Sequence, residues 1–90
     1  MFKLWAKAYN ENNKIIRNQT FEFKQEFDAK FLNAYLQVVC NAWHTETPIV
    51  LSYHVIGFNE FNSVKFKKAD FVDEVDFESM SIQLIPWIIP

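Results

Sequence analysis

Glycine is nearly absent from this chain of 90 residues, and Gly57 is the single example. Loops that cradle phosphate groups or form oxyanion holes usually need several glycines, because glycine lets the backbone approach a ligand closely at positive φ. Cysteine is equally scarce. One residue, Cys40, excludes an intramolecular disulfide and is typical of a reducing compartment. The sequence therefore supports neither a phosphate-binding loop nor a disulfide scaffold.

Long apolar runs are missing as well. A signal peptide needs an unbroken apolar stretch of roughly 7–15 residues, whereas the lysines at positions 3 and 7 interrupt residues 1–7. No run approaches the roughly 18 apolar residues that a membrane-spanning helix requires. We therefore expect a cytoplasmic protein with no membrane partner.

Aromatic side chains, in contrast, are abundant: ten phenylalanines, three tyrosines and three tryptophans. Half of the residues are hydrophobic, 22% are charged and the net charge is −2. This composition is ordinary for a globular protein and argues against disorder. The length suits one modest core, so residues 1–90 are predicted to form a single α+β domain. The acidic balance argues against nucleic acid as the main partner, because its binders usually carry a basic footprint.

The N-terminal third is predicted to form a hairpin. Residues 2–9 alternate with period two, as do residues 14–23, and the Asn-rich segment 10–13 suits a turn between them. The alternation slips at Ile15 and Ile16, which a β-bulge would explain.

Residues 25–44 are predicted to form one long helix, because they lack glycine and proline and place apolar residues at helical spacing. Two neighbouring apolar stripes together span about 200°, although a helix lying on a sheet needs only about 100°. The second stripe consists of Leu32, Leu36, Val39 and Trp43. We expect either the C-terminal segment or another copy of the protein to cover it.

The rest of the chain is predicted to form strands at 49–56, 64–68 and 80–84, with a turn at 57–63. Residues 70–79 suit either a short helical turn or an irregular acidic loop held by its apolar residues. The resulting order predicts an α+β fold: a mostly antiparallel sheet of four to five strands with one long helix packed on one face.

A resemblance rests on motifs at both ends of the chain. They are Leu4-Trp5-Ala6-Lys7, Asp70-Phe71 and Val75-Asp76-Phe77 followed by Met80. This pattern resembles short uncharacterised proteins of Gram-positive bacteria and would cover most of the chain. The resemblance implies a bacterial source, and it implies no activity, cofactor or site residue.

Candidate catalytic and metal-binding residues are few. His44, His54 and Cys40 fall short of the three or four well-spaced ligands of a zinc site. Cys40 lies near the C-terminal end of the predicted helix, whereas thiolates are stabilised at helix N-termini. The acidic run 70–78 could attract a cation but lacks the glycine of an EF-hand, so a solvated acidic face is the favoured interpretation. We therefore predict no enzyme, no catalytic residue, no metal and no cofactor.

The apolar tail 85–90 is predicted either to pack on its own core or to dock on a partner. Together with the second helix stripe, it predicts a small non-enzymatic cytoplasmic protein that acts by protein–protein binding. We expect it to self-associate as a homodimer or to bind another protein partner. The predicted interaction residues are Leu32, Leu36, Val39, Trp43, Trp87 and Ile88.

An alternative function follows from basic residues interleaved with aromatic ones. Trp5 lies on the first predicted strand, and Lys65, Phe66 and Lys67 lie on a later one. If these strands are neighbours, one sheet face would suit a nucleic-acid-binding accessory protein. The opposing interpretation is that the lysines protect an edge strand from pairing.

Overall fold

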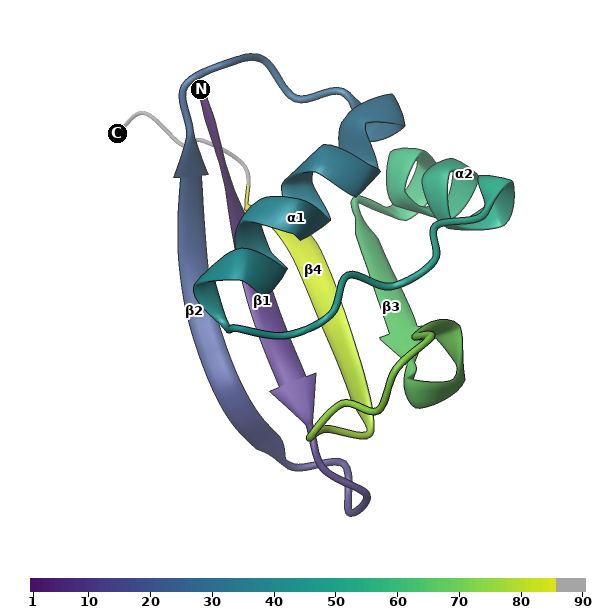
Figure 1. The fold of residues 1–90 in the computed structure, drawn as a ribbon. Helices are drawn as coiled ribbons and strands as arrows, with labels where there is room; N and C mark the ends of the chain where they lie inside the picture. The colour runs from purple at the N-terminus through teal and green to yellow at the C-terminus, as the bar shows by residue number, and fades with distance from the viewer. Residues whose placement is uncertain (86–90) are drawn as a thin grey trace.

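The computed structural model describes residues 1–85, which form a four-stranded antiparallel sheet with helices on one face (Figure 1). The strands are β1 (Phe2–Tyr9), β2 (Ile15–Phe23), β3 (Ser63–Lys67) and β4 (Ser79–Ile85), in the order β2-β1-β4-β3. The helical elements are the 3₁₀ turn η1 (Ala29–Phe31), α1 (Leu32–Ala42), α2 (Ser52–Phe61) and the 3₁₀ turn η2 (Lys68–Asp70). The predicted α+β class is confirmed, with four strands and with two α-helices where one was expected.

The turn between β1 and β2 is built by asparagine side chains. The Oδ1 atom of Asn10 accepts hydrogen bonds from the backbone N–H groups of Asn12 and Lys14, at 2.9 and 3.0 Å. Asn13 adopts a left-handed φ of 63°, which asparagine tolerates better than most residues. The predicted hairpin turn is thus confirmed.

The bulge predicted in this hairpin is also present. Ala8 pairs with Arg17, and the next residue, Tyr9, pairs with Ile15. Ile16 is therefore the extra residue on β2, as in other two-against-one bulges.

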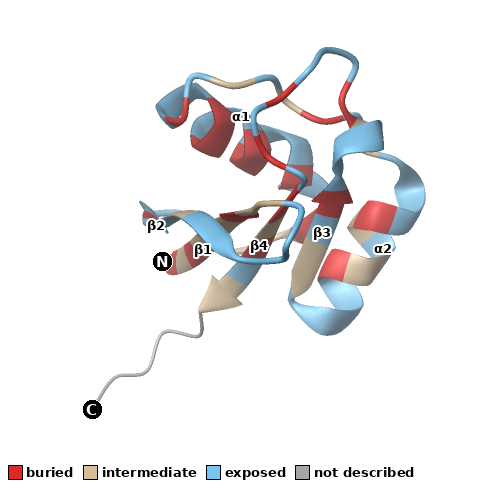
Figure 2. Cartoon of the chain, turned by 90° about the horizontal axis from the view of Figure 1, so that it is seen from below, coloured by how far each residue is buried: buried red, intermediate tan, exposed pale blue. Residues whose placement is uncertain are grey.

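The core lies between the sheet and the helices (Figure 2). β1 turns Ala6 and Ala8, both fully buried, toward α1, and these small side chains leave room for the larger ones of the helix. One end of the core is a cluster of aromatic rings whose contacting pairs have centroids 4.9–6.1 Å apart, a range that favours ring pairs. Its members are Phe2, Phe23, Phe27, Tyr35 and Phe58.

The first helical segment, Ala29–Ala42, is shorter than the predicted helix 25–44. Asp28 begins it, because its carboxylate accepts a backbone N–H two residues further on, at 3.1 Å. At the other end His44 has a left-handed φ of 54°, and the N–H of the following residue bonds to the Cys40 carbonyl at 3.0 Å. This is the Schellman arrangement, which ends a helix by turning the chain away from its axis.

The face that α1 presents to the sheet differs from the prediction. The stripe expected to meet a partner is Leu32, Leu36, Val39 and Trp43. All four side chains are buried in the chain's own core, so the prediction that they form surplus surface is wrong. A helix with two adjacent stripes can bury either one. Here the second stripe meets the sheet together with Tyr35 and Cys40, and Phe31 and Val38 of the first stripe remain exposed.

The largest departure from the prediction is α2. Residues 49–56 were expected to form a strand and 57–63 a turn, but Ser52–Phe61 is helical. Its β-branched residues favour strands. The spacing of its buried residues favours a helix, because His54 and Phe58 lie four residues apart, on the same side of a helix, and both are buried in the core.

The ends of α2 explain where it starts and stops. The Nδ1 atom of His54 accepts the backbone N–H of Leu51 at 2.9 Å, which satisfies a donor at the start of the helix. Asn62 adopts a left-handed φ of 58° and ends the helix, a role that asparagine shares with glycine.

We expect Gly57→Ala to raise the free energy of unfolding by about 0.5–1 kcal/mol, because alanine favours the helix interior over glycine. Gly57 lies inside α2, and a Cβ atom added there would meet nothing within 4 Å. Urea unfolding at 25 °C measures the change. A midpoint equal to or below that of the unmodified protein would contradict a helix at this position.

Candidate functional site

The layer of helices exposes several large apolar side chains. Seven of them, between 46% and 69% exposed, lie between η1 and the end of α2. They are Phe31, Val38, Ile49, Leu51, Tyr53, Ile56 and Phe61. We call this set the helical outer surface. Large apolar side chains gathered on one layer are typical of an interaction surface.

The same part of the chain carries almost no charge. Between Lys30 and Lys65 the only residues of Asp, Glu, Lys or Arg are Glu46 and Glu60. The centres of protein–protein interfaces are similarly depleted of charge and enriched in aromatic residues. This long uncharged run is visible in the sequence alone, and it is the signal that sequence reasoning missed.

The predicted interaction residues are not brought together at the surface. Those on α1 and at its end lie in the core, as described above. Trp87 and Ile88 lie outside the residues that the structure describes. The apolar surface of the helical layer is therefore made by other residues.

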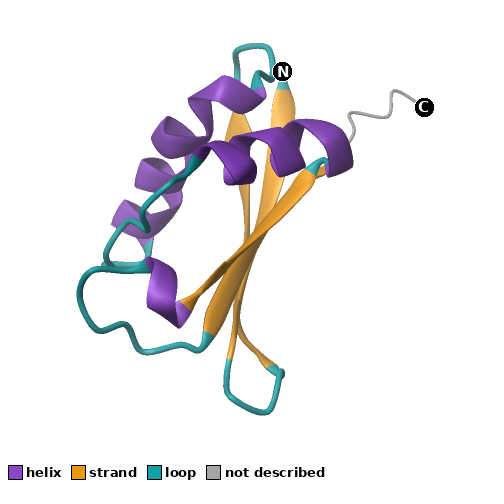
Figure 3. Ribbon diagram, turned by 90° about the vertical axis from the view of Figure 1, so that its right-hand side faces the viewer, coloured by secondary structure: helices purple, strands orange, loops and turns teal. Residues whose placement is uncertain are grey.

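The opposite face of the sheet carries no helix among residues 1–85 (Figure 3). We call it the uncovered sheet face. Its central row runs across all four strands, because Lys7 of β1 pairs with Asn18 of β2 and Ser81 of β4, which in turn pairs with Lys65 of β3. Paired residues of antiparallel strands share a face, so this row places two lysines on one surface.

The rows on either side of it carry aromatic rings. Trp5 pairs with Gln83 of β4 in one row. In the other, Tyr9 pairs with Ser79, whose partner on β3 is Lys67. Trp5, Lys65 and Lys67 thus share one face, but the strands that carry them are not neighbours as the prediction required, because β4 lies between β1 and β3.

The aromatic rings on this face lie beside the lysines. The Nζ atom of Lys7 is 3.9 Å from the centre of the Trp5 ring, and that of Lys65 is 5.2 Å from the centre of the Tyr9 ring. The indole N–H of Trp5 donates to Oδ1 of Asn18 at 2.6 Å. A hydrogen bond with Ser81 lowers the pKa of Tyr9, and Lys7 and Lys65 add to this effect.

Phe66 does not belong to the uncovered sheet face. It is fully buried on the opposite side of β3, with its ring centre 4.5 Å from that of His54. The prediction that it joins a nucleic-acid face is wrong, because successive side chains of a strand point to opposite faces and Lys65 and Lys67 take the uncovered one.

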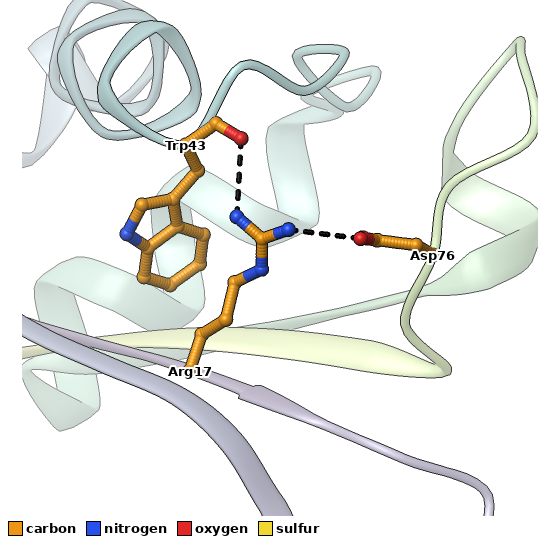
Figure 4. Close-up of polar contacts among 3 residues, drawn as sticks. All are labelled: Arg17, Trp43 and Asp76. Atoms are coloured by element: carbon orange, nitrogen blue, oxygen red, sulfur yellow. Dashed lines mark hydrogen bonds and ion pairs between the residues drawn. The ribbon is translucent and has the colours of Figure 1, made fainter.

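The acidic segment is an irregular loop that follows η2, as one of the two predicted alternatives has it. Phe71, Val75 and Phe77 are its buried anchors. Arg17 of β2 ties it to the end of α1: one guanidinium nitrogen donates to the Trp43 carbonyl at 3.1 Å and the other pairs with Asp76 at 2.8 Å (Figure 4).

A hollow of about 670 Å³ lies between this loop and the end of α1, and Arg17 and Cys40 are among its lining residues. A hydrogen bond with Asp73 raises the pKa of Glu46 in its wall, and the negative charge of Asp73 acts in the same direction. Within residues 1–85 no three side chains of His, Cys, Asp or Glu are placed to hold a metal ion.

Comparisons with known proteins add no information on the function of these surfaces. Among the described residues no helix has the length and apolar character needed to cross a membrane. No protein-family model matches the chain, and neither a curated protein nor a solved structure is significantly similar to it.

Proposed function

We propose that this chain is a non-enzymatic binding protein that pairs with a second copy of itself through the helical outer surface. The observation that carries the proposal is the combination of seven exposed apolar side chains with a nearly uncharged stretch of sequence. Exposure of this kind on a single layer costs solubility and is best accounted for by a partner that covers it.

The absence of charge favours a second copy as that partner. In a two-fold symmetric interface the same patch lies on both subunits, so a net charge on the patch would repel its own copy. The helical outer surface avoids this problem, because Glu46 and Glu60 are the only charged residues between Lys30 and Lys65.

The size of the molecule is compatible with such an interface. A stable interface covers about 800 Å² on each partner, and the accessible surface of the chain is 5890 Å². One face of the molecule is therefore enough. The central side chains would be Tyr53 and Ile56, which are at least 60% exposed and lie on the side of α2 opposite to Phe58.

We expect the protein to have a mass of about 21 kDa in solution, twice the chain mass of 10.7 kDa. Ile56→Lys should return it to the monomer mass, because the symmetry places two new charges in one apolar contact. Size-exclusion chromatography with light scattering, over a range of protein concentrations, measures both values. A monomer mass for the unmodified protein at high micromolar concentration would overturn the proposal.

Ile16→Lys is the matched control. Ile16 is also exposed, but it lies on β2, at the opposite edge of the sheet from β3, which α2 contacts. This variant should remain dimeric. If it dissociates while Ile56→Lys stays paired, the interface lies at the β2 edge and the helical outer surface is not the contact.

A further inference from the structure

The uncovered sheet face is rich in lysine, and the proposed self-association does not involve this face. The four strands place four lysines on it, Lys3, Lys7, Lys65 and Lys67, against one carboxylate, Glu22. The chain as a whole has a net charge of −2. The positive charge of this face is therefore a local concentration against the overall balance, and it suits a polyanion.

The rings of Trp5 and Tyr9 favour a polyanion that also carries aromatic groups able to stack on them. Trp5 and Tyr9 lie on the same strand four residues apart, so their Cα atoms are separated by about 13 Å. Lys7 lies between them, and Lys65 lies beside Tyr9. Alternating rings and ammonium groups match a chain of bases joined by phosphates, since the rings can stack on bases while the lysines contact the backbone.

The present ring–lysine contacts do not block such binding. An exposed cation–π contact is worth about 0.5–1 kcal/mol, whereas stacking of one base on an aromatic ring is worth about 1–3 kcal/mol. A base would therefore displace the Lys7 ammonium from the Trp5 ring, and the ammonium would gain a phosphate in exchange. The hydrogen bond from Trp5 to Asn18 keeps the indole in place.

We propose that the uncovered sheet face binds single-stranded nucleic acid through Trp5, Tyr9 and the lysines around them. A single strand fits better than a duplex, because its bases are free to leave their own stack and lie on the rings. Glu11 and Glu78 line a second, smaller hollow of about 230 Å³ together with Lys65 and Lys67. These carboxylates weaken the positive field there, so binding should centre on the Trp5 and Lys7 part of the face.

The test is fluorescence anisotropy with labelled 12-nucleotide oligodeoxythymidine and oligouridine at 50 mM salt. We expect saturable binding in the micromolar range that weakens as salt rises. Trp5→Leu should weaken it roughly five- to hundred-fold, because one stacking ring is lost. Lys65→Gln with Lys67→Gln should weaken it less and reduce the slope of log affinity against log salt by about 1.4.

The matched control is the pair Lys24→Gln with Lys30→Gln. It removes the same charge at two exposed positions outside the four strands and should leave affinity within about two-fold. Circular dichroism confirms that each variant is folded. Three results would overturn the proposal: no saturable binding, an equal loss in the control pair, or unchanged affinity in folded Trp5→Leu. Equal affinity for a duplex or for heparin would also overturn it, because charge alone would then account for binding.

This inference stands apart from the proposed dimer. Ile56 lies on the helical side of the sheet, so Ile56→Lys should bind the oligonucleotide with the same affinity per chain. If the protein is a monomer and still binds, only the proposed self-association fails. If the dimer is present and no oligonucleotide binds, only the nucleic-acid face fails.

Discussion

Phe58→Ala is expected to lower the free energy of unfolding by about 4 kcal/mol, whereas Phe61→Ala on the same helix should change it by less than about 0.5 kcal/mol. Phe58 is fully buried and its ring meets that of Phe27 at 5.1 Å, so its removal leaves a cavity in the aromatic cluster. Phe61 is 69% exposed. A chain of this size has a total stability of about 5–9 kcal/mol, so the first change should remove roughly 45–80% of it.

Urea unfolding followed by circular dichroism measures both values, at protein concentrations low enough to avoid self-association. The two variants make the same chemical change three residues apart, and each serves as the control for the other. Equal effects would contradict the burial of Phe58 and the exposure of Phe61 on the helix Ser52–Phe61.

This contrast concerns the segment where sequence reasoning failed most clearly. Residues 49–56 read as a strand because they are rich in β-branched and aromatic side chains. What favours the helix is that the side chains of His54 and Phe58 are buried where α2 contacts η1 and β3. Those contacts form only after the chain has folded, so the local preferences of the sequence could not reveal them. Asn62, which ends the helix in a left-handed conformation, is a residue type that favours this role.

The elements predicted well are those whose pattern is local. The period-two strands β1, β3 and β4 and the Asn10–Asn13 turn each depend on neighbouring residues in the sequence. The rotation of α1 does not. Both of its stripes are apolar, and the second one is buried in the same core as Ala6 and Ala8 of β1, which lie far away in the sequence.

On the candidate surfaces, too, the sequence predicts what depends on a local pattern and misses what depends on the folded chain. The sequence placed Trp5, Lys65 and Lys67 on one face on the condition that their strands are neighbours. The sheet order β2-β1-β4-β3 puts β4 between those strands, and the three residues still share a face because paired residues of antiparallel strands do. Phe66 lies between these two lysines in the sequence, and the same alternation turns its side chain inward, so it does not share their face.

Cys40 is expected to react with a thiol reagent at least a hundred-fold more slowly in the folded protein than in the unfolded chain. Its side chain is 1% exposed, and burial is the main cause that raises its pKa to about 11 from 9.0. Only the thiolate is nucleophilic, so at pH 8 two units of pKa alone remove about a hundred-fold of reactivity. The rate of reaction with a chromogenic disulfide, with and without 6 M guanidinium, measures the effect.

The control is an exposed thiol at the next position, in the double variant Cys40→Ala with Asn41→Cys, which should react freely. Equal rates at positions 40 and 41 would contradict burial of Cys40.

The same pKa shift predicts how stability depends on pH. Because the folded-state pKa of Cys40 lies above the unfolded one, the native thiol keeps its proton between about pH 9 and 11 while the unfolded thiol loses it. The contribution of Cys40 to the free energy of unfolding is fully present below pH 9 and is lost as pH rises toward 11. The loss is about 1.4 kcal/mol per pH unit and at most about 2.7 kcal/mol in total.

Tyrosines and lysines titrate in the same range, so the quantity to measure is the difference in the free energy of unfolding between the unmodified protein and Cys40→Ala, from urea unfolding at pH 8 to 10.5. That difference should shrink as pH rises, and a constant difference would show that Cys40 ionises equally easily in both states.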